Sequence, residues 1–424
     1  MLEEDKANTI FEYGKDKSKH TELVRISLPK SATVGSVEKT LDNLLREVGS
    51  EPVDLEIDMS SCAFIETGTL IFLIALMAYQ QQKQLSTRLR IPRSKKVRDF
   101  LRVWEFPQAV RDALGLKFLE VVCEEDHKYF GENKDSTEKL EYGGYIADTG
   151  KGKEILPSQW FYSIKTIFPS YVASQRLLAE EQSAKWKEQY IISILTRHLS
   201  GSGTRISSHI IFEAIMNALR HPGASKILTS SFFDRSYGRN KKAKGYFTIV
   251  FWDDGESAID TLMKAVNEGR EIRAVDVPRL YANYELNVED EDANKLPPQI
   301  VRSDFLPEQD TSEDLFLLAV TFPGVTRDIT GEGHHVDPAV LEEDEVFGMP
   351  GMGLHVLTNT AVDVFGGMVS LRTKSYFMNI KASPNGTRSK DKVRYLAKIK
   401  QYGDWMPQFP GNMLTIRLPL RVKL

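Results

Sequence analysis

The chain has 424 residues, of which 41% are hydrophobic, and it carries a net charge of -4 with a pI near 6.1. This length and apolar content suffice for more than one hydrophobic core, so we expect two or three domains. The slightly acidic balance gives no positive field that would favour nucleic acid as the main partner. The two cysteines, Cys62 and Cys123, suit neither a disulfide framework nor a zinc site and are typical of a reducing cytoplasm.

Neither the N-terminus nor the longest apolar run predicts a membrane segment. The first residues, MLEEDKANTI, are acidic and lack the apolar core of a secretory signal. The longest apolar run, TLIFLIALMAY from Thr69, is too short to cross a bilayer and predicts a buried helix. We therefore expect a cytoplasmic protein without membrane insertion.

Residues 20–122 alternate between strand and helix patterns. The order is a strand ELVRISL, a helix VGSVEKTLDNLLREVG, a buried strand VDLEIDMS, the apolar helix after Phe64, a strand RLRIP and a helix KKVRDFLRVW. Such alternation predicts a small α/β domain.

Residues 123–189 are predicted to connect two domains. Their first part, CEEDHKYFGENKDSTEKLEYGGYIADTGKGKE, is polar and rich in Gly and Lys, which is typical of a linker or an exposed segment. Within it, GGYIADTGKG differs from a phosphate-binding loop, because Gly144 comes one residue too early and Gly152 replaces the magnesium-binding Ser or Thr. Helical patterns resume at about Ser158 and lead into the next motif.

The motif FEAIMNALRHP places Glu213, Asn217 and His221 four residues apart, so the three side chains share one face of a helix. A solvated polar stripe is one interpretation. The flanking residues leave little polar surface, however, and buried polar groups need binding partners. Those partners are either protein groups or a ligand with a metal ion.

Two glycine-containing motifs follow. The strand patterns SKILTSSFF and YFTIVFW lead into DDGES, where Asp253 ends a strand and Gly255 allows a tight turn beside a flat ligand. Much later, FGMPGMGLHVL places Gly348, Gly351 and Gly353 before a helical run. Glycines at a helix start expose backbone N–H groups that favour phosphate.

In this order the three motifs resemble the ATP-binding domain of gyrase-type topoisomerases, heat-shock chaperones, histidine kinases and mismatch-repair proteins, the GHKL or Bergerat fold. The resemblance covers residues 190–424, including the strands GGMVSLRT and GNMLTIRLPL. It implies an α/β sandwich in which helices cover one face of a mixed sheet and ATP lies between helices and lid. Residues 260–347 would be a long lid insertion, and residues 376–409 a second insertion between the last two strands.

The resemblance implies a role for each matching residue. Asn217 would coordinate the Mg²⁺ that bridges the ATP phosphates, and Glu213 would be the general base. Asp253 would accept a hydrogen bond from the adenine amino group, while His221 would tune or cap the site. The other nucleotide-binding positions would be Gly255, Gly348, Gly351, Gly353, Leu354 and Thr373. The sequence departs from the family at Ser257, where a second glycine is usual.

The N-terminal segment VDLEIDMSSCAFIETGTLIFLIALM resembles the STAS fold of anti-sigma-factor antagonists. Phe64 and Ile65 match that family's motif, whereas Gly68 falls on the position of its phosphoacceptor serine, with Thr67 and Thr69 beside it. The resemblance implies a STAS-like α/β domain over residues 20–122. With Gly68 at the acceptor position, we expect this domain to act by contact rather than by being phosphorylated.

Three functions fit these observations. The first is a magnesium-dependent ATPase switch that regulates a protein partner, or a second copy of the chain, through nucleotide-dependent changes of the lid or dimer. The second is a protein serine/threonine kinase of the anti-sigma-factor type, favoured by the Glu-Ala-x-x-Asn-Ala spelling at Glu213. The third is a non-catalytic scaffold that responds to ATP. A histidine kinase is disfavoured, because no phosphoacceptor-helix motif precedes the domain.

Overall fold

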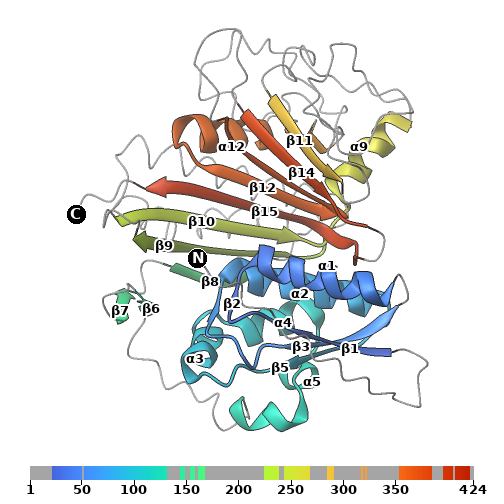
Figure 1. Cartoon of the computed structure of the whole chain (residues 1–424), viewed down its shortest axis with the longest axis vertical. Coiled ribbons are helices and arrows are strands. Elements are labelled where there is room, and N and C mark those ends of the chain that lie inside the picture. Colours follow the sequence, from blue (N-terminus) through green and yellow to red (C-terminus); the bar gives the residue numbers. More distant parts are fainter. Residues whose placement is uncertain are drawn as a thin grey trace, which may run out of the picture.

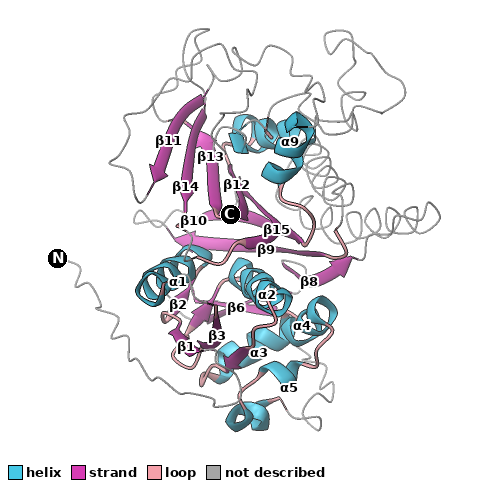
Figure 2. Cartoon of the chain, turned by 90° about the vertical axis from the view of Figure 1, so that its right-hand side faces the viewer, coloured by secondary structure: helices cyan, strands magenta, loops and turns pink. Residues whose placement is uncertain are grey.

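Two layers of secondary structure, each built on a β-sheet, form the described part of the chain (Figures 1 and 2). The computed structural model describes residues 22–49, 52–130, 144–148, 153–157, 161–167, 224–237, 243–267, 284–290, 317–318, 320–321, 353–383, 395–403 and 406–420. Residues 22–130 are called the N-terminal layer below, and the eight-stranded sheet that lies on it is called the central sheet.

The N-terminal layer contains a parallel sheet of β1 (Glu22–Ser27), β3 (Val53–Asp58) and β5 (Thr87–Arg90), in that order. Because the strands succeed one another in one direction across the sheet, right-handed crossovers place the connecting helices on the same face. A short parallel pair joins β2 (Ser31–Ala32) to β4 (Phe64–Ile65). The predicted alternation of strands and helices is confirmed here.

The connecting helices are α1 (Val34–Val48) and α2 (Thr67–Gln82). Thr33 and Ser36 start α1 as a reciprocal cap, in which each backbone N–H donates to the other residue's hydroxyl oxygen, at 2.9 and 3.3 Å. Four short helical segments complete the layer: α3 (Lys95–Val103), α4 (Phe106–Leu114), α5 (Phe118–Val121) and the 3₁₀ helix η1 (Glu124–Tyr129).

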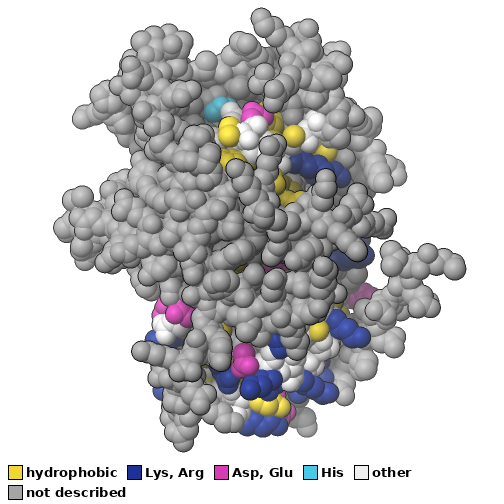
Figure 3. Space-filling model, turned by 90° about the vertical axis from the view of Figure 1, so that its left-hand side faces the viewer, with side chains coloured by type: hydrophobic (Ala, Val, Ile, Leu, Met, Phe, Trp, Pro, Cys, Tyr) yellow, Lys and Arg dark blue, Asp and Glu magenta, His cyan; other side chains and the backbone are white. Residues whose placement is uncertain are grey.

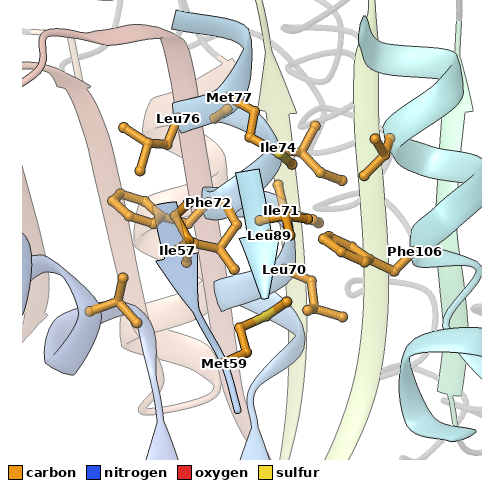
Figure 4. Packing of buried hydrophobic residues seen from close by; sticks show 14 of the residues in the cluster. Ile57, Met59, Leu70, Ile71, Phe72, Ile74, Leu76, Met77, Leu89 and Phe106 are labelled. Carbon is orange, nitrogen blue, oxygen red and sulfur yellow. The ribbon is translucent and has the colours of Figure 1, made fainter. Parts of the chain in front are cut away.

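The α2 helix is apolar on all sides because it lies between the two sheets. Ile57 and Leu89 of the small sheet approach it from one side, and Phe106 of α4 from another (Figure 4). On the side of the central sheet it packs against β9, β10 and β15. The prediction of a buried helix after Phe64 is therefore confirmed, and one hydrophobic cluster runs through α2 from the small sheet to the central sheet.

The central sheet has the order β11-β14-β13-β12-β15-β10-β9-β8. Every neighbouring pair is antiparallel except β11 with β14, which is parallel, so the sheet is mixed. Its strands are β8 (Phe161–Ile167), β9 (Ile227–Tyr237), β10 (Ala243–Asp253), β11 (Tyr284–Asp290), β12 (Met368–Lys374), β13 (Tyr376–Ala382), β14 (Tyr395–Gln401) and β15 (Phe409–Leu420). The predicted strands before DDGES and the two C-terminal strands are confirmed.

Both predicted insertions contribute strands to this sheet. Residues 376–409 hold β13 and β14, and the lid insertion holds β11, which pairs with β14. These three strands widen the sheet beyond β12. The segment between the last two predicted strands is thus part of the framework of the sheet.

The structure differs from the sequence-based prediction between residues 123 and 167. Helical patterns were expected from Ser158, but the structure has β8 at Phe161–Ile167 as the edge strand beside β9. Aromatic and β-branched side chains in FYSIKTI favour an extended backbone, and Ile164 and Ile167 are buried. Within GGYIADTGKG, Gly144–Asp148 form the strand β6, which pairs antiparallel with β7 (Lys153–Pro157).

The two faces of the central sheet meet different partners. One face lies on α1, α2 and α4 of the N-terminal layer (Figure 1). The opposite face carries a second apolar cluster with α9 (Ala258–Asn267) and with the π-helical segment η5 (Thr360–Val364), which continues α12 (Gly353–Asn359). In the described ranges no helix combines the length and the apolarity needed to cross a membrane.

Lys and Arg side chains gather over the N-terminal layer on the face shown in Figure 3. Several of the basic side chains of this layer already have structural partners. Arg98 lies 4.3 Å from the centre of the Tyr129 ring, and Arg102 donates to the Tyr129 carbonyl at 2.5 Å. Arg90 pairs with Glu56 at 3.1 Å. These contacts hold η1 and the sheet in place, which gives the arginines a structural role.

Candidate functional site

Three polar side chains lie in a row across the middle of the central sheet. Asp253 of β10 is paired with Asn412 of β15, and Asn412 is also paired with Thr373 of β12. Directly paired residues of neighbouring antiparallel strands point to the same face, so the three side chains share one face. Asp253 and Asn412 are each 5% exposed and Thr373 is 0% exposed. We call these residues the site row.

Hydrogen bonds orient the Asp253 carboxylate in this row. Its Oδ1 accepts from the Gly255 backbone N–H at 3.1 Å and from Asn412 Nδ2 at 3.2 Å. Asn412 Nδ2 also donates to the Glu256 carbonyl at 3.0 Å, and Asn412 Oδ1 accepts from the Ala258 N–H at 2.8 Å. Buried polar groups require such partners. Asn412 therefore connects β15 to the whole DDGES loop.

Two glycines allow the backbones around Asp253 to approach closely. Gly411 has φ of +69°, and a Cβ atom there would lie 1.8 Å from the Asp253 carbonyl oxygen. At Gly255, a Cβ atom would lie 3.1 Å from both Asp253 Oδ1 and Ala224 Cβ. The Thr373 hydroxyl donates to the Gly411 carbonyl at 3.1 Å. Position 411 therefore accommodates glycine and no residue with a side chain.

Asp254 and Ser257 anchor the two ends of the DDGES loop. Asp254 accepts from the backbone N–H groups of Ser225 and Lys226 at 2.6 and 2.8 Å, which holds the start of β9. Ser257 Oγ accepts from the Asp260 N–H at 2.9 Å and so caps the first turn of α9. Ser257 departs from the expected glycine, and its hydroxyl serves as a helix cap.

The end of β12 is irregular next to the site row. The pairing with β15 shifts register between Thr373 and Lys374, and Lys374 has a positive φ of 49°. The Lys374 ammonium pairs with the Asp260 carboxylate at the start of α9. Backbone irregularities of this kind re-aim side chains and are frequent beside functional sites.

A polar network on α12 was not predicted from the sequence. His355 Nδ1 lies 3.0 Å from the Thr321 carbonyl and its Nε2 lies 2.8 Å from Asn359 Nδ2. The Tyr395 hydroxyl of β14 lies 3.0 Å from Asn359 Oδ1 and also contacts Asp363. Burial lowers the pKa of His355, although the Thr321 carbonyl and Asp363 act in the other direction. A neutral His355 therefore links α12 to the described part of the long insertion.

Five of the predicted nucleotide-binding residues lie in the described ranges. The structure brings Asp253, Gly255 and Thr373 together and places Gly353 at the first position of α12. Leu354 packs against the apolar cluster on the same side of the sheet. Glu213, Asn217, His221, Gly348 and Gly351 lie outside the described residues. Asn412 was missed, although a polar residue at the start of an apolar strand was a visible signal.

Other chemistry-bearing residues of the described ranges do not form a second site. Burial raises the pKa of Cys62 to about 12 and that of Cys123 to about 11, with further contributions from Asp58 and Glu56 respectively. Both thiols are free and buried, which makes them poor nucleophiles at neutral pH. Among the described residues, no group of three or more His, Cys, Asp or Glu side chains is arranged to hold a metal ion.

No family model matches the chain, and searches of curated proteins and of solved structures find no match either. The geometry of the site row is thus the evidence from which its chemistry can be argued. That geometry presents a carboxylate, an amide and a hydroxyl side by side on one face of the sheet. Beside them, the backbone turn at position 411 accommodates only glycine.

Proposed function

We propose that the chain is a magnesium-dependent ATP-binding protein whose central sheet carries a Bergerat-type nucleotide site, and that it works as an ATPase switch. The observation that carries this proposal is the site row with its glycine loop. A buried carboxylate held by Gly255 and Asn412 is a fixed acceptor. Carboxylates offer about four acceptor positions, so an adenine amino group can share Asp253 with these donors.

The residues of the site row fit the base end of a nucleotide. Asp253 would accept from the amino group, and the Thr373 hydroxyl, whose proton is donated to the Gly411 carbonyl, would act as an acceptor beside it. Gly255 lets the loop pass close to Ala224 and to Asp253 Oδ1, which keeps its backbone N–H on the carboxylate that would face the base. Apolar residues around Leu354 and Ile259 line the same side of the sheet, which suits an aromatic base.

The phosphate end of the nucleotide would be held by the other predicted residues. Asn217 would ligate Mg²⁺, and Gly351 and Gly353 would offer backbone N–H groups to the phosphates. Bound Mg²⁺ would neutralise phosphate charge. Glu213 would act as the general base. It would accept a proton from water in an ATPase, or from a hydroxyl in a serine/threonine kinase. We propose in the same way that the N-terminal layer is a STAS-like domain.

The carboxylate of Asp253 provides the direct test of nucleotide binding. Asp253→Asn replaces the carboxylate with an amide, whose NH₂ group would face the adenine amino group as a second donor. The loss of a hydrogen bond to a charged group costs roughly 1.5–3 kcal/mol. We expect calorimetry with ATP and MgCl₂ to show affinity lower by roughly tenfold or more. Asp254→Asn is the matched control, since Asp254 anchors β9, and its affinity should stay within about twofold of wild type. Equal affinity of Asp253→Asn and wild type would remove Asp253 from the site.

The choice between turnover and simple binding rests on Glu213 and Asn217. Glu213→Ala should still bind ATP while turnover falls by roughly 10²–10⁴, whereas Asn217→Ala should lose both. Labelled ATP distinguishes the functions, because free phosphate indicates an ATPase and label on a polypeptide indicates a kinase. If wild type binds ATP and shows neither product with any partner, the scaffold function is correct.

A further inference from the structure

The site row has a second row of side chains directly behind it. Trp252, Met413 and Arg372 are the neighbours of Asp253, Asn412 and Thr373 in their strands, and they are paired with one another across the same three strands. Successive side chains of a strand point to opposite faces. This second row, which we call the interface row, therefore faces the N-terminal layer.

Arg372 is the charged member of the interface row, and its guanidinium group contacts buried side chains. Its guanidinium donates to Glu38 Oε1 of α1, and the two residues are 2% and 4% exposed. The Tyr402 hydroxyl donates to Glu38 Oε2 at 2.9 Å. The guanidinium carbon also lies 5.3 Å from the ring centre of Phe72 on α2, and 4.7 Å from that of Tyr402. Helices α1 and α2 of the N-terminal layer thus both contact Arg372.

Met413 of the row lies beside the first turn of α2, and Trp252 belongs to the same apolar cluster. Trp252 and Met413 belong to the apolar cluster that contains α2. A Cβ atom at Gly68, in the first turn of α2, would lie 3.7 Å from Val250 and 3.9 Å from Met413. There is consequently little free space between the first turn of α2 and the back of the site row.

We propose that Glu38 and Arg372 are positioning residues for the nucleotide, so that the N-terminal layer sets the affinity of the site on the far side of the sheet. This inference rests on the proposed function. The ion pair with Glu38 fixes the position of Arg372. Thr373 is the next residue of β12 and lies where the pairing with β15 shifts register. Thr373 in turn holds the Gly411 carbonyl, which lies in the backbone turn packed on Asp253.

The connection from Glu38 through Arg372 and Thr373 to Gly411 is short, and each step is a covalent bond, a hydrogen bond or a packing contact. A nucleotide that requires one position of Thr373 and Gly411 would bind more tightly when Arg372 is held by Glu38. By linkage, bound nucleotide must strengthen the contact between α1 and the sheet by the same factor. Differential contact in the two states is the condition for such coupling.

The test compares two carboxylates of α1 that lie one helical turn apart. Glu38→Gln removes the charge that faces Arg372. Asp42→Asn is the matched control, because Asp42 is also 4% exposed and also contacts the central sheet, through Lys400 Nζ at 3.4 Å. Lys400 is paired with Phe377 of β13, and Phe377 is paired with Arg372, so Asp42 contacts the same cross-strand row two strands further from the site row. ATP with MgCl₂ is titrated calorimetrically into each full-length protein, and urea unfolding gives the stability of each.

We expect Glu38→Gln to bind ATP roughly fivefold or more weakly than wild type, and Asp42→Asn to stay within about twofold. Tyr402→Phe removes only one hydroxyl from the cluster and repeats the test with a smaller perturbation, and its affinity should fall in the same direction. Equal affinity of Glu38→Gln and Asp42→Asn, at whatever stability, would overturn the inference while leaving the proposed function intact. Absence of ATP binding by wild type would overturn both.

Hydrogen exchange gives a second measurement that a purely structural role would not change. Adding ATP and MgCl₂ to wild type should increase the protection of backbone amides in α1 and in the first turn of α2. In Glu38→Gln at saturating ATP this increase should be lost, while it should persist in Asp42→Asn. Unchanged protection of α1 in wild type would contradict the coupling.

Discussion

Gly411 occupies a position in the site where two backbones touch. Its φ of +69° is costly for other residues, and a side chain there would meet the Asp253 backbone at 1.8 Å. Thr373 holds the Gly411 carbonyl on the other side, so the turn cannot relax away from Asp253 without breaking that hydrogen bond. The shape of the site thus depends on a residue that has no side chain.

A pair of glycines separates the steric contribution of Gly411 from its backbone strain. Gly115 has nearly the same φ, +70°, and no atom lies within 4 Å of a Cβ placed there. Gly115→Ala should therefore cost only the strain, about 1–2 kcal/mol, whereas Gly411→Ala should cost roughly 3 kcal/mol or more because backbone must move. Urea unfolding of both variants measures the difference. Equal losses would show that the turn at Gly411 moves freely.

At the scale of elements, α12 and the strands added beyond β12 form a connected unit. His355 and Asn359 of α12 contact Thr321 of the long insertion and Tyr395 of β14. The helix that begins at Gly353, the last glycine of the predicted box, is therefore tied to both inserted segments through polar groups. An unusual π-helical turn, η5, follows directly, and such turns occur often at functional sites.

The lowered pKa of His355 makes this unit sensitive to acid. The unfolded chain binds a proton near the ordinary His pKa of about 6.5, while burial makes the folded state bind it less readily. Stability from this residue is therefore present above about pH 6.5 and is lost as pH falls through the lower pKa of the folded state. The loss approaches about 1.4 kcal/mol per pH unit for one proton.

His355→Gln isolates that proton, since glutamine can still donate to Thr321 without titrating. We expect the free energy of unfolding of wild type to fall more steeply than that of His355→Gln between about pH 6.5 and 5. Urea unfolding at several pH values gives the two slopes. Parallel slopes would mean that His355 does not change its proton affinity on folding.

At the scale of the whole molecule, the N-terminal layer and the central sheet share one hydrophobic cluster and a buried ion pair. Removing one partner of a buried ion pair typically costs 3–5 kcal/mol, so Glu38 also stabilises the docked arrangement. The layer packs on the face of the sheet opposite to the site row. It leaves that face to α9, α12 and η5.

This arrangement buries the residues at which a phosphorylation switch would act. Thr67 is 2% exposed and Thr69 is 0% exposed, and the Thr69 hydroxyl donates to the Ala32 carbonyl at 3.2 Å. Gly68 between them packs against Val34 and the central sheet. A kinase cannot reach these hydroxyls while the layer is docked.

Mass spectrometry after incubation with ATP and MgCl₂ should accordingly find no phosphate on Thr67 or Thr69. The same digest should be checked for phosphate on the exposed Ser86, which controls for nonspecific labelling. Phosphate on Thr67 or Thr69 would show that the N-terminal layer leaves the central sheet, and it would favour the kinase function.

The sequence alone determined several of the local elements of this protein. The strand β10 and the buried helix α2 follow from apolar periodicity, because alternation and continuous apolar runs reflect burial directly. The strands β12 and β15 were expected from the resemblance of GGMVSLRT and GNMLTIRLPL to the ATP-binding family. DDGES predicted a carboxylate and a tight turn at the end of β10, and the structure has both. The expectation of helix over Phe161–Ile167 was wrong, since short apolar runs do not distinguish strand from helix without a partner strand.

Only the tertiary structure decided what lies beside each residue. Asn412 is 159 residues from Asp253, and Glu38 is 334 residues from Arg372, so neither pair has any signal in local spacing. The same holds for β11, β13 and β14, whose strands become recognisable only through pairing with one another. Burial of both faces of α2 likewise required a second sheet. Pairing between distant residues is set by the packing of the whole chain, so a short stretch of sequence does not contain the information that determines it.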